Sequence, residues 1–166
     1  MARKTAFMSG SASHIFFLPD DAATTRLGEL LASLLQAGDS VLLAGDIGAG
    51  KTHLCRALIR ARLGRNEDIP SPTFTLVQTY DAEGTEVWHA DLYRLSHPDE
   101  ALELGLDAAF ETSICLVEWP DRLGALAPAD ALHIGLSAQN DGRIAQISGG
   151  RAGLLDRVAQ AYNHDI

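Results

Sequence analysis

The sequence predicts an α/β fold in three layers, with a mixed, mainly parallel central sheet and antiparallel hairpin additions. Residues 45–52 carry the main observation, because they fit the phosphate-binding pattern G-x-x-x-x-G-K-[ST] without a substitution. The apolar run Ser40–Ala44 before this motif is typical of a buried strand, and His53–Ile59 after it is typical of a helix. A strand, a glycine loop and a helix in this order predict the P-loop NTPase fold.

The first predicted element is a helix that begins at Asp20 or Asp21 and ends near Gln36. Aspartate is a favourable helix cap, the leucines that follow recur at helical spacing, and Gly38 stops the pattern. The strand and helix of the phosphate-binding motif come next. A polar loop from Gly64 to Pro72 then leads into the middle of the chain.

The middle of the chain predicts a hairpin and a short helix. Residues 73–80 are rich in Thr, Phe, Val and Tyr and predict a strand, residues 81–84 predict a turn, and residues 85–90 predict the returning strand. The short helix begins at Ser96-His97-Pro98, with the proline in its first turn, and Gly105 closes it.

The last third predicts a buried strand, a second hairpin and a final helix. Residues 114–117 are apolar throughout, as in parallel strands that are covered on both faces. Residues 132–138 and 143–148 flank Asn140-Asp141-Gly142, in which Asp-Gly is a strong hairpin signal. Residues 152–162 predict the helix that ends the fold.

Length, composition and charge limit the possible functions. At 166 residues, the chain predicts one P-loop ATPase domain, residues 15–166, behind a loose N-terminal tail, residues 1–14. We expect a cytoplasmic protein without a membrane segment, because no apolar run could span a bilayer and no signal-peptide pattern is present. Cys55 and Cys115 lie in apolar runs, which favours buried thiols over a redox pair. The net charge of −9 and the lack of a basic run argue against direct nucleic-acid binding.

The glycine loop predicts how a nucleotide is held. Its backbone N–H groups turn inward on an anion, and the helix N-terminus adds the positive end of its dipole. The loop residues predicted to contact the phosphates are Asp46, Ile47, Gly48, Ala49, Gly50, Lys51 and Thr52. Lys51 is expected to reach the β- and γ-phosphates, and the Thr52 hydroxyl is expected to ligate Mg²⁺. An Asn-Lys-x-Asp element for guanine is absent, so we expect ATP as the nucleotide.

Glu118 is predicted to complete the Mg²⁺ site. P-loop NTPases place a metal-binding acid after a hydrophobic strand, and Glu118 directly follows the apolar residues 114–117. Glutamate in place of the usual aspartate is one methylene longer, so it binds the metal either directly or through water. The alternative is a solvated acid at the end of a strand. The metal role is favoured because no other acid follows so apolar a strand.

Three further positions keep more than one interpretation. Asp91 either orders the metal's water shell or the attacking water, or it caps a helix or pairs with Arg94. Thr73 lies where nucleotide switches place a threonine that meets Mg²⁺ and the γ-phosphate; the alternative is an ordinary loop before a strand. His89 is either a hydrogen-bonded structural histidine, which is the favoured interpretation, or a catalytic residue.

Four motifs together resemble the TsaE (YjeE) family, the ATPases of bacterial tRNA threonylcarbamoyladenosine biosynthesis. They are residues 45–52, 71–77 (SPTFTLV), 89–95 (HADLYRL) and 116–120 (LVEWP). Their order and spacing match the family from about residue 19 to residue 120. Each motif after the first is weak alone, but four in order form a specific pattern. The C-terminal hairpin and helix carry no motif, and the N-terminal tail is not part of the pattern.

The resemblance implies a small cytoplasmic ATPase that binds ATP and Mg²⁺ and hydrolyses ATP poorly alone. It implies action with a TsaB–TsaD heterodimer, which places threonylcarbamoyl on the adenosine beside the anticodon of tRNAs that read codons beginning with A. The TsaD subunit carries out the transfer, and ATP hydrolysis supports turnover of the complex. Contact with tRNA is then expected only through the complex.

The resemblance also implies roles for single residues. Lys51 and Thr52 match the P-loop pair, Glu118 matches the Mg²⁺ acid, and Asp91 matches an acid needed for activity. Trp119 matches a tryptophan beside the nucleotide. Asp20 and Asp21 lie where the family's N-terminal segment approaches the base.

We therefore expect an ATPase in which Lys51, Asp91, Glu118 and Thr73 form the catalytic set. No clear arginine finger is present; Arg94 and Arg122 are the candidates in this chain, and Arg94 with Tyr93 also fits a docking face or ordinary packing. The runner-up function is a P-loop small-molecule kinase, which needs an acceptor pocket and a lid. Another alternative is a non-catalytic module in which ATP only shapes a docking surface.

Overall fold

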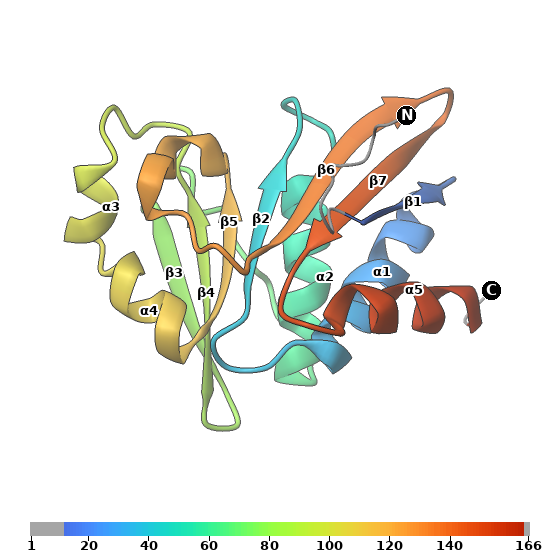
Figure 1. The fold of residues 1–166 in the computed structure, drawn as a ribbon, viewed down its shortest axis with the longest axis horizontal. Helices are drawn as coiled ribbons and strands as arrows, with labels where there is room; N and C mark the ends of the chain where they lie inside the picture. The colour runs from blue at the N-terminus through green and yellow to red at the C-terminus, as the bar shows by residue number, and fades with distance from the viewer. Residues whose placement is uncertain (1–11, 165–166) are drawn as a thin grey trace.

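The computed structural model describes residues 12–164, which form a seven-stranded sheet with helices on both faces (Figure 1). The strands are β1 (Ser13–Leu18), β2 (Ser40–Ala44), β3 (Val77–Ala82), β4 (Thr85–Asp91), β5 (Ile114–Glu118), β6 (Leu132–Gln139) and β7 (Gly142–Gly149). The helices are α1 (Asp21–Leu34), α2 (Lys51–Leu63), α3 (Asp99–Glu103), α4 (Leu106–Thr112), the 3₁₀ helix η2 (Pro120–Leu126) and α5 (Leu154–His164).

The strands lie in the order β1-β7-β6-β2-β5-β4-β3. The central strands β6, β2, β5 and β4 are parallel to one another, whereas β3, β7 and β1 pair antiparallel with their neighbours. This arrangement confirms the predicted fold class. Because β2 lies between β5 and β6, the loop that follows β2 lies at the centre of the sheet's carboxyl edge.

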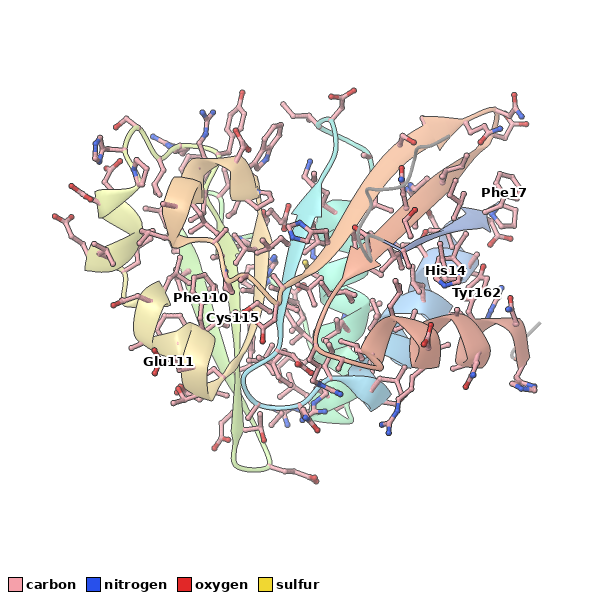
Figure 2. The ribbon with its side chains drawn as sticks, in the orientation of Figure 1. His14, Phe17, Phe110, Glu111, Cys115 and Tyr162 are labelled. Atoms are coloured by element: carbon pink, nitrogen blue, oxygen red, sulfur yellow. The ribbon has the colours of Figure 1, made fainter. Side chains whose placement is uncertain are left out.

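The central strands bury both faces, which explains their continuous apolar sequences. In β2, Val41 and Leu43 face the core that the sheet forms with α1, α2 and α5, whereas Leu42 faces a second core with α3, α4 and η2. Cys115 and Phe110 belong to this second core and lie together on that side of Figure 2. Two apolar layers around one sheet give the predicted three-layer architecture.

Helix α1 begins where the sequence predicts, because the Asp20 carboxylate accepts a hydrogen bond from the Ala23 amide at 2.9 Å. It ends at Leu34 rather than near Gln36. Its contact with α2 is close at Gly28, where a Cβ atom would lie 2.8 Å from that of Ala57. This contact fixes the helix that follows the glycine loop against its neighbour.

The strand predicted over residues 73–80 is wrong at its start, because β3 begins only at Val77. Leu76 adopts a left-handed φ of 70°, and its amide donates to the Pro72 carbonyl at 2.7 Å. The Leu76 carbonyl then accepts from the Asp91 amide at 2.9 Å. The resulting turn directs Thr73 away from the sheet ladder and towards the end of β4.

Three elements were not predicted from the sequence: β1, α4 and η2. Ser13 and His14, expected in the tail, pair with β7 as part of β1, while residues 1–11 of that tail lie outside the described residues. Gly105 ends the short α3 and, with a φ of 85°, also begins α4. Each missed element is short, and each depends on contacts with distant parts of the chain.

The C-terminal elements follow the prediction with small shifts. The β6–β7 hairpin turns at Asn140-Asp141, one residue before the predicted Asp-Gly, because Gln139 pairs with Gly142. Helix α5 spans residues 154–164 rather than 152–162, and its Tyr162 hydroxyl donates to the Phe17 carbonyl of β1 at 3.1 Å (Figure 2). Within residues 12–164, no helix is long and apolar enough to cross a membrane.

Candidate functional site

The sheet brings the predicted acids and the glycine loop together at its carboxyl edge. Glu118, the last residue of β5, is in register with Leu43 of β2 on one side and with Asp91 of β4 on the other. The glycine loop starts two residues after Leu43, so three neighbouring strands end at one place. Ligand sites at this edge are typical of parallel α/β sheets.

The glycine loop turns sharply before α2. Gly48 and Gly50 have φ values of 85° and 106°, which residues with a side chain rarely adopt. The Lys51 ammonium donates to the Gly45 and Asp46 carbonyls, and it lies 4.3 Å from the centre of the Trp119 ring. Lys51 is therefore buried between its own loop and the residue after β5.

Thr52 and Glu118 are in direct contact. The Thr52 hydroxyl lies 2.9 Å from Oε1 and 3.1 Å from Oε2 of the Glu118 carboxylate. The same carboxylate accepts a hydrogen bond from His89 Nε2 at 2.7 Å, and both of these side chains are buried. Hydroxyl and carboxylate oxygens are the hard donors that Mg²⁺ prefers, so this pair is chemically suited to hold it.

Asp91 and Thr73 meet on the other side of Glu118. The Thr73 hydroxyl donates to Asp91 Oδ2 at 3.3 Å and is also 2.8 Å from the Ser71 hydroxyl. Asp91 Oδ1 accepts from the Tyr93 amide at 3.1 Å, which fixes the orientation of the carboxylate. Asp91 pairs with Thr73 rather than with Arg94, in contrast to one interpretation considered for the sequence.

These side chains line a pocket of about 390 Å³. The pocket is formed by the glycine loop, the start of α2, the loop before β3 and the ends of β4 and β5. Its lining residues are Ile47, Gly48, Gly50, Lys51, Thr52, His53, Ser71, Thr73, Asp91, Tyr93, Glu118 and Trp119. Of the predicted site residues, only Asp46 and Ala49 do not line it; the Asp46 carbonyl contacts Lys51, and Ala49 is buried behind the loop.

Negative charge dominates the floor of this pocket. Burial first, and then the carboxylates of Glu118 and Asp91, raise the pKa of the neighbouring Cys55 thiol well above its ordinary value. The positive charges of Arg56 and then Lys51 counteract this effect only in part. The predicted buried thiols are observed, since Cys55 and Cys115 are both free and inaccessible. Two buried carboxylates beside a phosphate-type loop are suited to hold a divalent cation.

Several other candidate residues lie outside the pocket. Arg94 is exposed and stacks on the Phe74 ring at 5.1 Å, and Arg122 has a buried Nε atom without a hydrogen-bond partner. Asp20 caps α1, and Asp21 forms an ion pair with Arg143 at 3.0 Å. None of these side chains reaches the cluster around Glu118 in this structure.

Sequence reasoning missed two residues that contact the site. His89 was predicted to be a hydrogen-bonded structural histidine; it is hydrogen-bonded, but its partner, the predicted metal acid Glu118, was not foreseen. Arg143 gave no local signal: it comes from β7, donates to the Thr24 hydroxyl at 2.9 Å and packs against Gly50. Only the sheet order brings Arg143 to the glycine loop.

A larger cavity of about 770 Å³ lies along α1, α2 and the loop after α2. Two of its arginines use their Nε atoms to hold backbone carbonyls: Arg56 donates to the Ile69 carbonyl at 2.7 Å and Arg60 to the Glu67 carbonyl at 2.8 Å. This cavity lacks the buried acids and the glycine loop. We therefore assign the chemistry to the smaller pocket, because function depends on the groups that converge and not on volume.

Comparison with known proteins identifies close relatives. The family model described as "Threonylcarbamoyl adenosine biosynthesis protein TsaE" matches residues 18–145. Proteins named "tRNA threonylcarbamoyladenosine biosynthesis protein TsaE" are similar: that of Rickettsia conorii is 41% identical over 131 residues, covering 78% of this chain and 75% of the relative. That of Synechocystis is 44% identical over 118 residues, covering 67% and 73%.

Similarity extends to a more distant relative and to a solved structure. The protein of the same name from Haemophilus influenzae is 35% identical over 133 residues, covering 76% of this chain and 84% of the relative. The crystal structure of Bacillus subtilis YdiB superimposes with a TM-score of 0.77 at 25% identity, covering 94% of this chain and 98% of YdiB. The residues matched by the family model, 18–145, include every residue that lines the pocket described above.

Proposed function

This chain belongs to the TsaE family of threonylcarbamoyl adenosine biosynthesis proteins, and we propose that it is the Mg²⁺-dependent ATPase of this tRNA-modifying system. One observation carries the proposal: Thr52 of the P-loop helix contacts the buried Glu118 carboxylate, directly beside Lys51. This is the pairing of hydroxyl and acid from which P-loop NTPases make their metal site.

In this proposal, the loop amides and Lys51 bind the ATP phosphates. Lys51 exchanges the Gly45 and Asp46 carbonyls for phosphate oxygens, and the Trp119 ring stays beside its ammonium. Thr52 and Glu118 supply oxygen ligands for Mg²⁺, which when bound neutralises charge on the β- and γ-phosphates. Binding therefore needs little rearrangement beyond these exchanged partners.

Asp91 and Thr73 act on the hydrolysis step in this proposal. Their hydroxyl and carboxylate are already paired, and both line the pocket next to Glu118. Thr73 is held by a turn rather than by the sheet, so it is free to follow the γ-phosphate. The Asp91 carboxylate orients the attacking water and accepts its proton.

Partner proteins complete the site in this proposal. Among the described residues, no arginine lines the pocket, and an arginine supplied in trans raises the rate of related enzymes by about 10³–10⁵. Around the pocket, Ile47, Tyr93 and Phe74 expose large apolar side chains, and Phe74 is 82% exposed. Such a rim is suited to a protein partner, for which we propose the TsaB–TsaD heterodimer. With a net charge of −9, the chain contacts tRNA only through that complex.

The test compares the wild type with Glu118→Gln, alone and with the heterodimer. We expect the wild type to hydrolyse ATP slowly alone and faster with the heterodimer, and Glu118→Gln to lose the Mg²⁺-dependent turnover. If the variant keeps both this turnover and tRNA modification, the metal assignment is wrong. If ATP is bound but its hydrolysis never responds to the heterodimer, the partner-activated function is wrong. Consumption of ATP only with a small phosphoryl acceptor would instead identify a kinase.

A further inference from the structure

His89 is a buried titratable residue next to the proposed metal site, to which the proposed mechanism assigns no role. It belongs to β4, is fully inaccessible, and its Nε2 atom lies 2.7 Å from Glu118 Oε2. The strand register places His89 opposite Leu116 and Asp91 opposite Glu118, so the imidazole lies diagonally below the carboxylate on the same face of the sheet. Its position is therefore fixed by the strand ladder and not by a flexible loop.

The direction of this hydrogen bond follows from chemistry. A carboxylate only accepts hydrogen bonds, so the imidazole carries its proton on Nε2 and donates it to Glu118. The other ring atom, Nδ1, is buried and has no hydrogen-bond partner. Within the described residues, the only hydrogen bond of the His89 ring is therefore the one to Glu118.

The two donors on Glu118 differ in what a metal does to them. Thr52 donates its only hydroxyl proton to the carboxylate in this structure. In the proposed function a lone pair on the Thr52 oxygen binds Mg²⁺, so the direction of its hydroxyl proton is set by the metal as well as by Glu118. The contact from His89 involves Oε2 alone and does not conflict with a ligand at Oε1.

We propose that His89 is a positioning residue for Mg²⁺: its Nε2–H holds Glu118 Oε2, so that Oε1 stays directed at Thr52 when the metal binds. This inference rests on the proposed function, because it concerns the same metal. Outer-shell donors of this kind typically change metal affinity or activity by about 10–100-fold when they are removed.

Cys55 offers a competing interpretation of the same cluster. The ligand atoms of Cys55, His89 and Glu118 all lie within 4.8 Å of one another, which is also compatible with a site for a thiophilic metal. However, burial and the nearby carboxylates raise the pKa of Cys55, and metal ligation needs its thiolate. We therefore assign His89 to Glu118 and treat Cys55 as packing.

The experiment measures ATP affinity by calorimetry in Mg²⁺ and in EDTA, so that no turnover is required. His89→Gln retains an amide donor near the position of Nε2, His89→Met removes the donor, and His89→Asn stops short of Oε2. We expect His89→Met and His89→Asn to lose about 10–100-fold of the affinity gained from Mg²⁺, with little change in EDTA. His89→Gln and the control Cys55→Ala should keep most of that gain.

Three results would overturn the inference. One is that His89→Met and His89→Asn gain as much ATP affinity from Mg²⁺ as the wild type does. Another is a loss in His89→Gln as large as that in His89→Met, since packing and not the donor would then be responsible. The third is a loss of this affinity gain in Cys55→Ala, which would favour a site for a thiophilic metal formed by Cys55, His89 and Glu118. By contrast, if the wild type gains nothing from Mg²⁺ and Glu118→Gln behaves like it, the proposed function itself fails, independently of His89.

Discussion

The position of Arg143 predicts that two glycines of the same loop differ in the stability lost when each is replaced by alanine. Gly48 and Gly50 both have positive φ values, 85° and 106°. A Cβ atom at Gly48 would meet nothing within 4 Å, whereas one at Gly50 would lie 2.8 Å from Arg143 Nε and 3.0 Å from its Cζ. We therefore expect Gly50→Ala to destabilise the protein more than Gly48→Ala does.

The magnitude follows from the contacts that Arg143 must give up. Both substitutions cost about 1–2 kcal/mol for a side chain in left-handed backbone. Gly50→Ala also displaces Arg143 from the Thr24 hydroxyl, a bond of about 0.5–1.5 kcal/mol, and from Asp21, an exposed pair of about 0–1 kcal/mol. The excess is about 0.5–2.5 kcal/mol. For a chain of this size it lowers Tm by about 1–10 °C relative to Gly48→Ala.

The assay is thermal and urea unfolding of both variants without nucleotide, each with and without Arg143→Ala. The three atoms nearest to a Cβ atom at Gly50 all belong to Arg143, so the Arg143→Ala background removes the closest contacts. The two glycine substitutions should then cost the same to within about 0.5 kcal/mol.

Two results would refute this reasoning. In one, Gly50→Ala unfolds at the same temperature as Gly48→Ala, so that Arg143 moves aside without loss. In the other, the difference between the two variants persists in the Arg143→Ala background, so that backbone strain alone explains it.

Two further predictions concern the pocket and the core. Asp91→Asn keeps the oxygen that accepts from the Tyr93 amide but loses the charge; phosphate release with the heterodimer should fall by about 10²–10⁴-fold while calorimetry shows unchanged ATP affinity, and a parallel loss of binding would contradict this role. Burial raises the pKa of Cys115 to about 12 from 9.0, so the native state keeps a proton that the unfolded state loses. The free energy of unfolding should therefore fall as the pH rises from 9 to 12. Measured by urea unfolding, its decrease with pH should be smaller in Cys115→Ala than in the wild type by about 1.4 kcal/mol per pH unit, and equal decreases in the two proteins would contradict the prediction.

The centre of the fold could be predicted because its signals are local. The strand, glycine loop and helix around Lys51 are adjacent in sequence, and the apolar residues before Glu118 mark a strand that is buried on both faces. Since parallel strands end at the same edge, these two patterns already placed Thr52 near Glu118. The observed contact of 2.9 Å follows from the register of β2 and β5.

The N-terminal strand could not be predicted, because β1 does not alternate in polarity. Its inward residues, Phe16 and Leu18, are apolar, but so are the outward residues Ile15 and Phe17, which are 66% and 52% exposed. A strand with two apolar faces has no period of two to detect. Pairing with β7, more than a hundred residues later in the chain, decides its structure.

The start of β3 was mispredicted for a different reason. Residues 73–76 have the composition of a strand, but the Leu76 carbonyl bonds to the Asp91 amide in a bend that ends the ladder. Tertiary contact therefore overrides local propensity at the point where Thr73 must leave the sheet to reach Asp91. Such conflicts between local and global preferences are expected at functional sites.

Glutamate at position 118, where aspartate is usual, connects the sequence pattern to the geometry of the site. Glu118 is in register with Leu43, before the glycine loop begins, so the carboxylate must reach forward to meet Thr52. The additional methylene provides this reach, but it also adds a rotatable bond that has to be ordered. Hydrogen bonds from Thr52 and His89 hold the carboxylate in place. A shorter acid would need less support, so the role that we infer for His89 follows from the choice of glutamate.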